Sequence, residues 1–121
     1  MKKILIVEDD KLLSKALSAK LKEEKYEVLT AYNGEEGLTA GKKHKPDLIL
    51  LDLNMPKMDG LTMLRSMRET TWGADTTVVI LTNSSNKEKV SQALNQYVFR
   101  YMVKSDWDID QIAAEIKKIL G

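Results

Sequence analysis

Four short runs of consecutive apolar residues recur along this chain, and they restrict its fold more than any other feature. The runs cover residues 4–7, 48–51, 78–81 and 101–103. Unbroken apolar runs are typical of strands that are covered on both faces, as in a parallel sheet, because half-exposed strands alternate apolar and polar residues. We therefore predict four buried parallel strands, with the weaker run at residues 27–31 as a fifth, outer strand.

The segments between these runs have the apolar spacing of helices. Apolar residues three and four apart form stripes within residues 11–24 and 109–120, and shorter stripes at residues 61–67 and 90–94. We also predict a helix at residues 34–43, although this segment has fewer apolar side chains than the other helical segments. Three residue pairs have the spacing of an N-terminal capping box: Ser85 with Glu88, Asn33 with Glu36, and Asp108 with Gln111. We therefore predict five helices, each of which follows one strand.

Strands that alternate with helices imply repeated right-handed βαβ crossovers, and these build a three-layer α/β sandwich. The chain length of 121 residues is close to the commonest size of one domain. No internal repeat, low-complexity tract or linker interrupts the alternation. We therefore expect residues 1–121 to form a single domain around one sheet.

The composition excludes several classes of protein. Nineteen Lys and Arg balance eighteen Asp and Glu, and the formal net charge of +1 argues against a general polyanion-binding surface. The chain has no Cys and one His, which excludes a disulfide framework and thiolate or imidazole metal clusters. Its N-terminal apolar run is too short for a signal peptide or a membrane span. We expect a cytoplasmic protein that binds neither nucleic acid directly nor a membrane.

Polar and charged side chains follow each of the four strong runs. In open parallel sheets the carboxyl ends of the strands meet at one edge, where ligands bind. Carboxylates about 4 Å apart repel by roughly 4 kcal/mol at an effective dielectric constant near 20, so a cluster needs a cation or raised pKa values. Oxygen-only ligands favour Mg²⁺ or Mn²⁺. The side chains that we expect at this edge are Glu8, Asp9, Asp10, Asp52, Thr82 and Lys104.

These groups are the components of a phosphoryl-transfer site, in which positioning and charge neutralisation supply most of the catalysis. The strings ILIVEDD, PDLILLDLNMPKMDG, VVILTNSS and YMVK resemble the receiver domain of two-component response regulators, the family that includes the single-domain chemotaxis regulator. The resemblance spans almost the whole chain. It implies an α/β, flavodoxin-like doubly wound (βα)5 sandwich with five parallel strands in the order 2-1-3-4-5.

The resemblance also implies which residues hold the metal and accept the phosphoryl group. Asp52 resembles the phosphoacceptor. Glu8 and Asp9 resemble the acidic pair that, together with Asp52, holds Mg²⁺ or Mn²⁺. The backbone carbonyl of Asn54 would complete the ligands that the protein provides.

Three further residues are expected to receive and transmit the signal. Thr82 resembles the switch hydroxyl that binds the phosphoryl group, Lys104 the ion-pairing amine, and Tyr101 the aromatic residue that turns inward on activation. The added negative charge is expected to draw Thr82 inward and to switch a protein-docking surface. That surface is formed by the fourth helix, the last strand and the last helix, at about residues 85–121.

The implied function is not that of an enzyme but that of a signalling domain that catalyses its own Mg²⁺-dependent phosphorylation and dephosphorylation. The phosphoryl group would come from a histidine kinase, a phosphotransfer protein or a small donor such as acetyl phosphate. A downstream target protein would read the phosphorylated state. A phosphorylation-linked homodimer is a further possibility.

Three positions depart from the commonest pattern of the family. Ser105 stands where most members have a proline, usually in a cis peptide bond, and we expect no cis bond here because a non-proline cis bond costs roughly 3 kcal/mol. Asn83 is bulkier than the usual Ala or Gly beside Thr82, and would restrict access to the phosphoryl group. Tyr97 and Val98 replace a frequent Gly-Ala pair. None of these departures removes a group of the candidate site.

Functions from other classes fit the same residues less well. A flavodoxin-type FMN carrier needs a Ser-, Thr- and Gly-rich phosphate loop after its first strand, where this chain has three acids. A haloacid dehalogenase-like phosphohydrolase has a second Asp two residues after its nucleophile, where this chain has Asn54. A degenerate receiver that serves only for docking stays open as an alternative, although the set of site residues here is complete.

Overall fold

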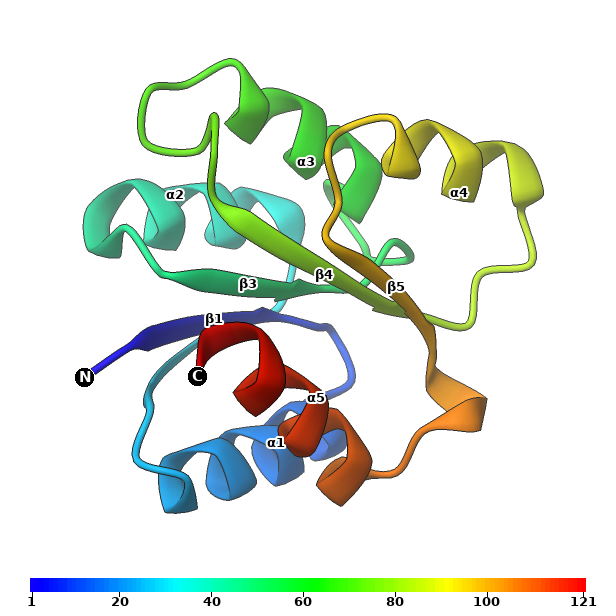
Figure 1. The fold of residues 1–121 in the computed structure, drawn as a ribbon. Coiled ribbons are helices and arrows are strands. Elements are labelled where there is room, and N and C mark those ends of the chain that lie inside the picture. Colours follow the sequence, from blue (N-terminus) through cyan, green and yellow to red (C-terminus); the bar gives the residue numbers. More distant parts are fainter.

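Five strands alternate with five α-helices along residues 1–121, all of which the computed structural model describes (Figure 1). The elements are β1 Lys3–Val7, α1 Lys11–Glu23, β2 Glu27–Ala31, α2 Gly34–His44, β3 Leu48–Leu51, α3 Gly60–Arg68, β4 Thr77–Thr82, α4 Lys87–Leu94, β5 Arg100–Val103, the 3₁₀ turn η1 Lys104–Asp106, and α5 Ile109–Leu120. Each predicted strand and helix is present, and strand ends differ from the predicted ones by one residue at most. No helix combines the length and the apolar character that crossing a membrane requires.

The five strands form one parallel sheet in the order β2-β1-β3-β4-β5. Helices α1 and α5 cover one face of the sheet, and α2, α3 and α4 cover the other face (Figure 1). This is the doubly wound, flavodoxin-like sandwich that the sequence predicts. The strand order reverses between β1 and β3, which is the point where open α/β sheets bind ligands.

Both faces of the sheet are buried, which explains the unbroken apolar runs. Along β1, Ile4 and Ile6 belong to the core under α1 and α5, whereas Leu5 and Val7 belong to the core under the other three helices. All four side chains are fully buried. Because successive residues of a strand point to opposite faces, a strand with two covered faces needs an apolar residue at every position.

The start of α4 differs from the prediction. The spacing of Ser85 and Glu88 predicts a capping box, but Asn86 is the N-cap of the helix. Its side chain accepts the backbone N–H of Lys89 at 3.0 Å. Asparagine is as favourable an N-cap as serine, so the residue one position later takes the role. The other two predicted caps are confirmed: Asn33 accepts the N–H of Glu36, and Asp108 forms a full capping box with Gln111.

The first residue of α3 approaches the end of β3 more closely than any side chain would allow. The N–H of Gly60 donates to the carbonyl oxygen of Leu53 at 3.0 Å. A Cβ atom on Gly60 would lie 2.1 Å from the backbone oxygen of Asp52. Glycine therefore seats the N-terminus of α3 directly against the residue that follows β3.

We expect Gly60→Ala to lower the free energy of unfolding by about 2 kcal/mol or more, because the added methyl group would overlap backbone atoms. Urea denaturation of both proteins measures the difference. Thr62→Ala, at an exposed position in the same turn of α3, is the matched control and should change stability by less than about 1 kcal/mol. Equal unfolding midpoints for wild type and Gly60→Ala would show that this junction is loosely packed.

Candidate functional site

Charged and polar side chains gather at the edge where the strands end. Glu8 and Asp9 follow β1, Asp52 follows β3, Thr82 ends β4, and Lys104 follows β5. Glu8, Asp52 and Thr82 are almost completely buried, with 3%, 4% and 0% of their surface exposed. Asp9 is exposed and Lys104 is half-buried. The fold therefore brings five residues of the predicted site to one place.

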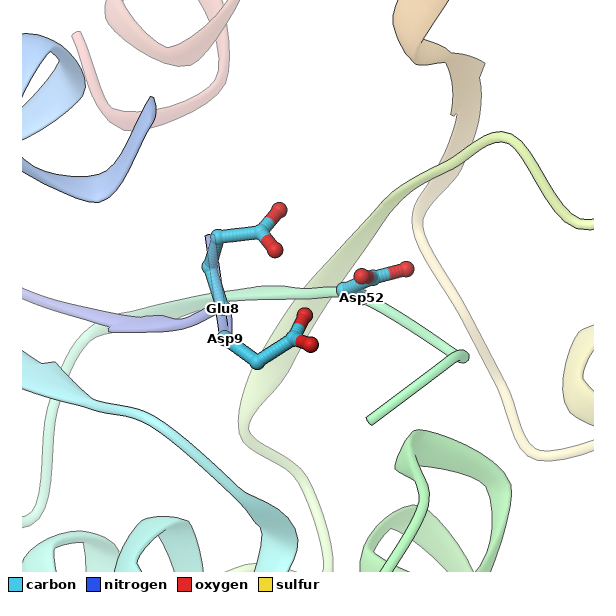
Figure 2. A group of neighbouring side chains, drawn as sticks. All are labelled: Glu8, Asp9 and Asp52. Atoms are coloured by element: carbon cyan, nitrogen blue, oxygen red, sulfur yellow. The ribbon is translucent and has the colours of Figure 1, made fainter. Parts of the chain in front are cut away.

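Three carboxylates of this group lie close together (Figure 2). One oxygen atom of each of Glu8, Asp9 and Asp52 lies within 4.8 Å of the others. The donor set consists of oxygen atoms alone, which suits a hard divalent cation. The fourth acid of the region, Asp10, caps α1 through its side chain and is not part of the cluster. Glu8, Asp9 and Asp52 therefore fit the predicted metal site.

Lys104 bridges two of these carboxylates. Its Nζ lies 2.5 Å from Oε1 of Glu8 and 3.1 Å from Oδ2 of Asp52. Burial disfavours the charged ammonium, but the hydrogen bond to Glu8 and the charge of Asp52 outweigh burial and raise the pKa of Lys104 above its usual value. The ammonium therefore stays charged at neutral pH and neutralises part of the acidic cluster.

Burial dominates the ionisation of Glu8. It raises the pKa of the Glu8 carboxyl to about 7, although hydrogen bonds from Lys104 and from the backbone of Asp10 favour the charged form. The nearby charge of Asp52 raises this pKa as well. One ammonium group thus leaves the buried carboxylates short of positive charge. A divalent cation would supply that charge.

Both side-chain oxygens of Asp52 accept hydrogen bonds. Oδ1 accepts the Thr82 hydroxyl at 2.7 Å and the backbone N–H of Asn54 at 3.2 Å. Oδ2 accepts the ammonium of Lys104. The Thr82 oxygen in turn accepts the backbone N–H of Ser84 at 3.2 Å. The Thr82 hydroxyl thus already faces Asp52 in this structure, and the expected movement of Thr82 on phosphorylation stays a prediction.

Two predicted residues lie at the margin of the site. Asn54 is exposed, and its backbone N–H contacts Asp52. Tyr101 on β5 is half-buried and packs against the core under α2, α3 and α4. It also lines a surface hollow with Val90 and Leu94 of α4. The metal-ligand role of the Asn54 carbonyl and the switch role of Tyr101 stay predictions.

Two contacts near the site join residues that the sequence does not link. Asp59, the N-cap of α3, forms an ion pair with Lys89 of α4 at 2.8 Å. Asn83 accepts the backbone N–H of Ser105 at 3.0 Å. The peptide bond before Ser105 is trans. Asp59 has a local signal, since an acid before an apolar helix is typical of an N-cap. No local sequence pattern predicts the contacts of Lys89, Asn83 and Ser105.

Comparison with known proteins shows the family of this chain. Residues 4–117 match the family model described as the response regulator receiver domain. The chain belongs to this family. The receiver domain is 37% identical over 120 residues to the response regulator ArlR of Staphylococcus aureus, and the match covers 99% of the chain and 53% of ArlR. The chain thus spans about half the length of the curated relatives it matches.

Solved structures of related receiver domains share the fold. The CheY-like receiver domain protein of Methanospirillum hungatei JF-1 has a TM-score of 0.90 and 27% identity, over 99% of this chain and 94% of that one. The manganese-bound form of the response regulator Rcp1 has a TM-score of 0.81 and 29% identity, over 98% and 91% of the two chains. The predicted family and strand order are confirmed. The protein is a two-component signalling domain, and phosphoryl acceptance is the general function of its family.

We expect the wild-type receiver domain to lose stability relative to Glu8→Gln as the pH rises from about 5 to about 8 without divalent cations. The pKa of Glu8 is raised from 4.5 to about 7, so the folded chain holds a proton that the unfolded chain releases. Ionising this carboxyl therefore opposes folding across that range, whereas glutamine does not titrate. Urea denaturation in EDTA measures the effect. A stability difference that stays constant with pH would contradict it.

Proposed function

We propose that Asp52 accepts a phosphoryl group from the phosphohistidine of a histidine kinase or phosphotransfer protein, or from a small donor such as acetyl phosphate. The observation that carries the proposal is the contact of Asp52 with both Lys104 and Thr82. In the transfer, an oxygen of Asp52 forms a bond to phosphorus while the bond from phosphorus to the donor nitrogen or oxygen breaks. The donor leaves with that electron pair, and the product is an aspartyl phosphate.

Lys104 and Thr82 are the groups that would receive the phosphoryl oxygens. Both already donate hydrogen bonds to Asp52, so oxygens added at this carboxylate come within reach of the same donors. The ammonium offsets negative charge, and the hydroxyl supplies a directed hydrogen bond. Donors held in place before the reaction stabilise developing charge without the cost of reorganising around it.

Glu8, Asp9 and Asp52 would hold Mg²⁺, with the backbone carbonyl of Asn54 as a further ligand. A bound divalent ion neutralises the oxygens of a transferring phosphoryl group. The oxygen-only cluster and the raised pKa of Glu8 support this assignment. The related response regulator Rcp1 has a manganese-bound form, which supports Mn²⁺ as an alternative ion.

Phosphorylation would reach partner proteins through the surface formed by α4, β5 and α5, at about residues 85–121. The N–H of Ser84, in the loop before α4, bonds to the Thr82 hydroxyl, so a change at this hydroxyl acts on that loop. Helix α4 is lightly attached, with Ala93 as its one buried residue. An ion pair from Lys89 to Asp59 links it to α3. A helix with one buried residue is suited to move.

A downstream target protein is the proposed reader of this surface. Leu94, Tyr97 and Phe99 leave large apolar side chains exposed between the end of α4 and the start of β5. Exposed apolar side chains that gather in one region are typical of protein interaction sites. A phosphorylation-linked homodimer is the alternative, and size-exclusion chromatography with and without acetyl phosphate distinguishes the two. We place this exchange in the cytoplasm.

Incubation with Mg²⁺ and acetyl phosphate should add one phosphoryl group to the wild-type chain, as detected by intact mass. Asp52→Asn should stay unmodified because its amide is not a nucleophile. Lys104→Met should react at least about 100-fold more slowly, since it lacks the charge that faces the phosphoryl oxygens. Asp75→Asn, at an exposed position away from the cluster, is the matched control. An unmodified, folded wild type would favour the docking-only receiver, and rapid hydrolysis of many phosphate esters would favour a phosphohydrolase.

Mg²⁺ should protect the wild type against thermal unfolding and protect Asp9→Asn much less, because the variant lacks one charged ligand. A cation at about ten times its dissociation constant stabilises the folded state by about 1.4 kcal/mol. Thermal denaturation in EDTA and at increasing Mg²⁺ measures the effect. Glu23→Gln, which alters an exposed acid at the C-terminal end of α1, should keep the full protection. Equal protection of Asp9→Asn and wild type would place the ion elsewhere.

A further inference from the structure

Beyond the last paired residues of β4 and β5, one side chain continues to join the two chain segments. The pairing of these strands ends at Thr82 and Val103. A further hydrogen bond runs from the backbone N–H of Ser105 to Oδ1 of Asn83, at 3.0 Å. We call this contact the side-chain rung. It connects the loop that leads to α4 with the turn that leads to α5.

The rung joins the two loops that carry the donors to Asp52. Asn83 directly follows Thr82, whose hydroxyl lies 2.7 Å from Oδ1 of Asp52. Ser105 directly follows Lys104, whose ammonium lies 3.1 Å from Oδ2. The two donors are thus connected through the carboxylate of Asp52, through the strand pairing that ends at Thr82 and Val103, and through the rung. The rung extends the strand pairing past the two donors, and it does not depend on the chemical state of Asp52.

The rung needs a particular atom from each of its residues. Ala or Gly at position 83 would provide no side-chain acceptor, and proline at position 105 would provide no N–H. These are the residues that the family resemblance leads us to expect at the two positions. The departures at Asn83 and Ser105 therefore combine into one contact, and either departure without the other would leave its polar group without this partner.

We propose that Asn83 and the backbone N–H of Ser105 are positioning groups that hold the Thr82 hydroxyl and the Lys104 ammonium at the spacing that receives the phosphoryl oxygens. The proposal rests on the phosphoacceptor role proposed above for Asp52. During transfer both donors exchange their hydrogen bonds to Asp52, and the rung keeps the two loops together. Small displacements of positioned groups lower transfer rates strongly, so loss of the rung slows the transfer without abolishing it.

The test compares rate constants for phosphorylation by acetyl phosphate, measured by intact mass at saturating Mg²⁺. Asn83→Ala and Ser105→Pro should each lower the rate constant about three- to tenfold, the range for loss of one hydrogen bond, and leave the half-saturating Mg²⁺ concentration unchanged. Ser105→Ala keeps the backbone N–H and should match the wild type. Because both substitutions remove the same contact, the double variant should be no slower than the slower single variant.

A second measurement follows the Ser105 amide proton by NMR with no phosphoryl donor present. Asn83→Ala should shift this resonance and speed its exchange with solvent. If Ser105→Pro does not fold, this amide measurement and the phosphorylation rate of Asn83→Ala together test the proposal. An unchanged Ser105 amide or a wild-type rate in Asn83→Ala would overturn the proposal, as would effects that multiply in the double variant. If Asn83 protects the amide but the wild type accepts no phosphoryl group, the role of Asp52 is overturned and the positioning role with it.

Discussion

The contact of one ammonium group with two buried carboxylates is the interaction on which this edge of the sheet depends. Glu8 and Asp52 are almost completely buried, and Lys104 donates a hydrogen bond to each of them. The three groups follow three different strands, β1, β3 and β5. Their pairing therefore balances charge and also holds three strand ends in place. Thr82 at the end of β4 completes the arrangement through Asp52.

Much of the fold could be predicted from the sequence because a sheet covered on both faces imposes a simple local pattern. Residues 4–7 and 48–51 are apolar at every position, and both runs are fully enclosed strands. The site could be predicted for a related reason. In a parallel sheet the residues after each strand meet at one edge, so topology alone brings Glu8, Asp52 and Lys104 together.

The remaining features depend on contacts that no local pattern encodes. Asn83 directly follows the last paired residue of β4, Ser105 follows that of β5 after Lys104, and the sequence does not specify that they form a hydrogen bond there. Helix α4 is capped by Asn86 and not by Ser85. Sequence patterns locate a helix boundary only to within one or two residues, so they do not distinguish these neighbours. The orientation of Thr82 is a rotamer choice that Asp52 and the Ser84 N–H determine together.

The hydrogen-bond donors of the proposed switch, the Thr82 hydroxyl and the Lys104 ammonium, are occupied before any phosphoryl group is added. Thr82 and Lys104 already bind Asp52, so in the proposed mechanism a phosphoryl group replaces one anionic acceptor by another. The gain is a difference between charged hydrogen bonds of about 1.5–3 kcal/mol each. A shift from roughly 1% to roughly 99% of the active arrangement needs about 5.5 kcal/mol. In the proposed mechanism, phosphorylation alone would therefore bias the population, and the affinity of the bound partner would set how complete the response becomes.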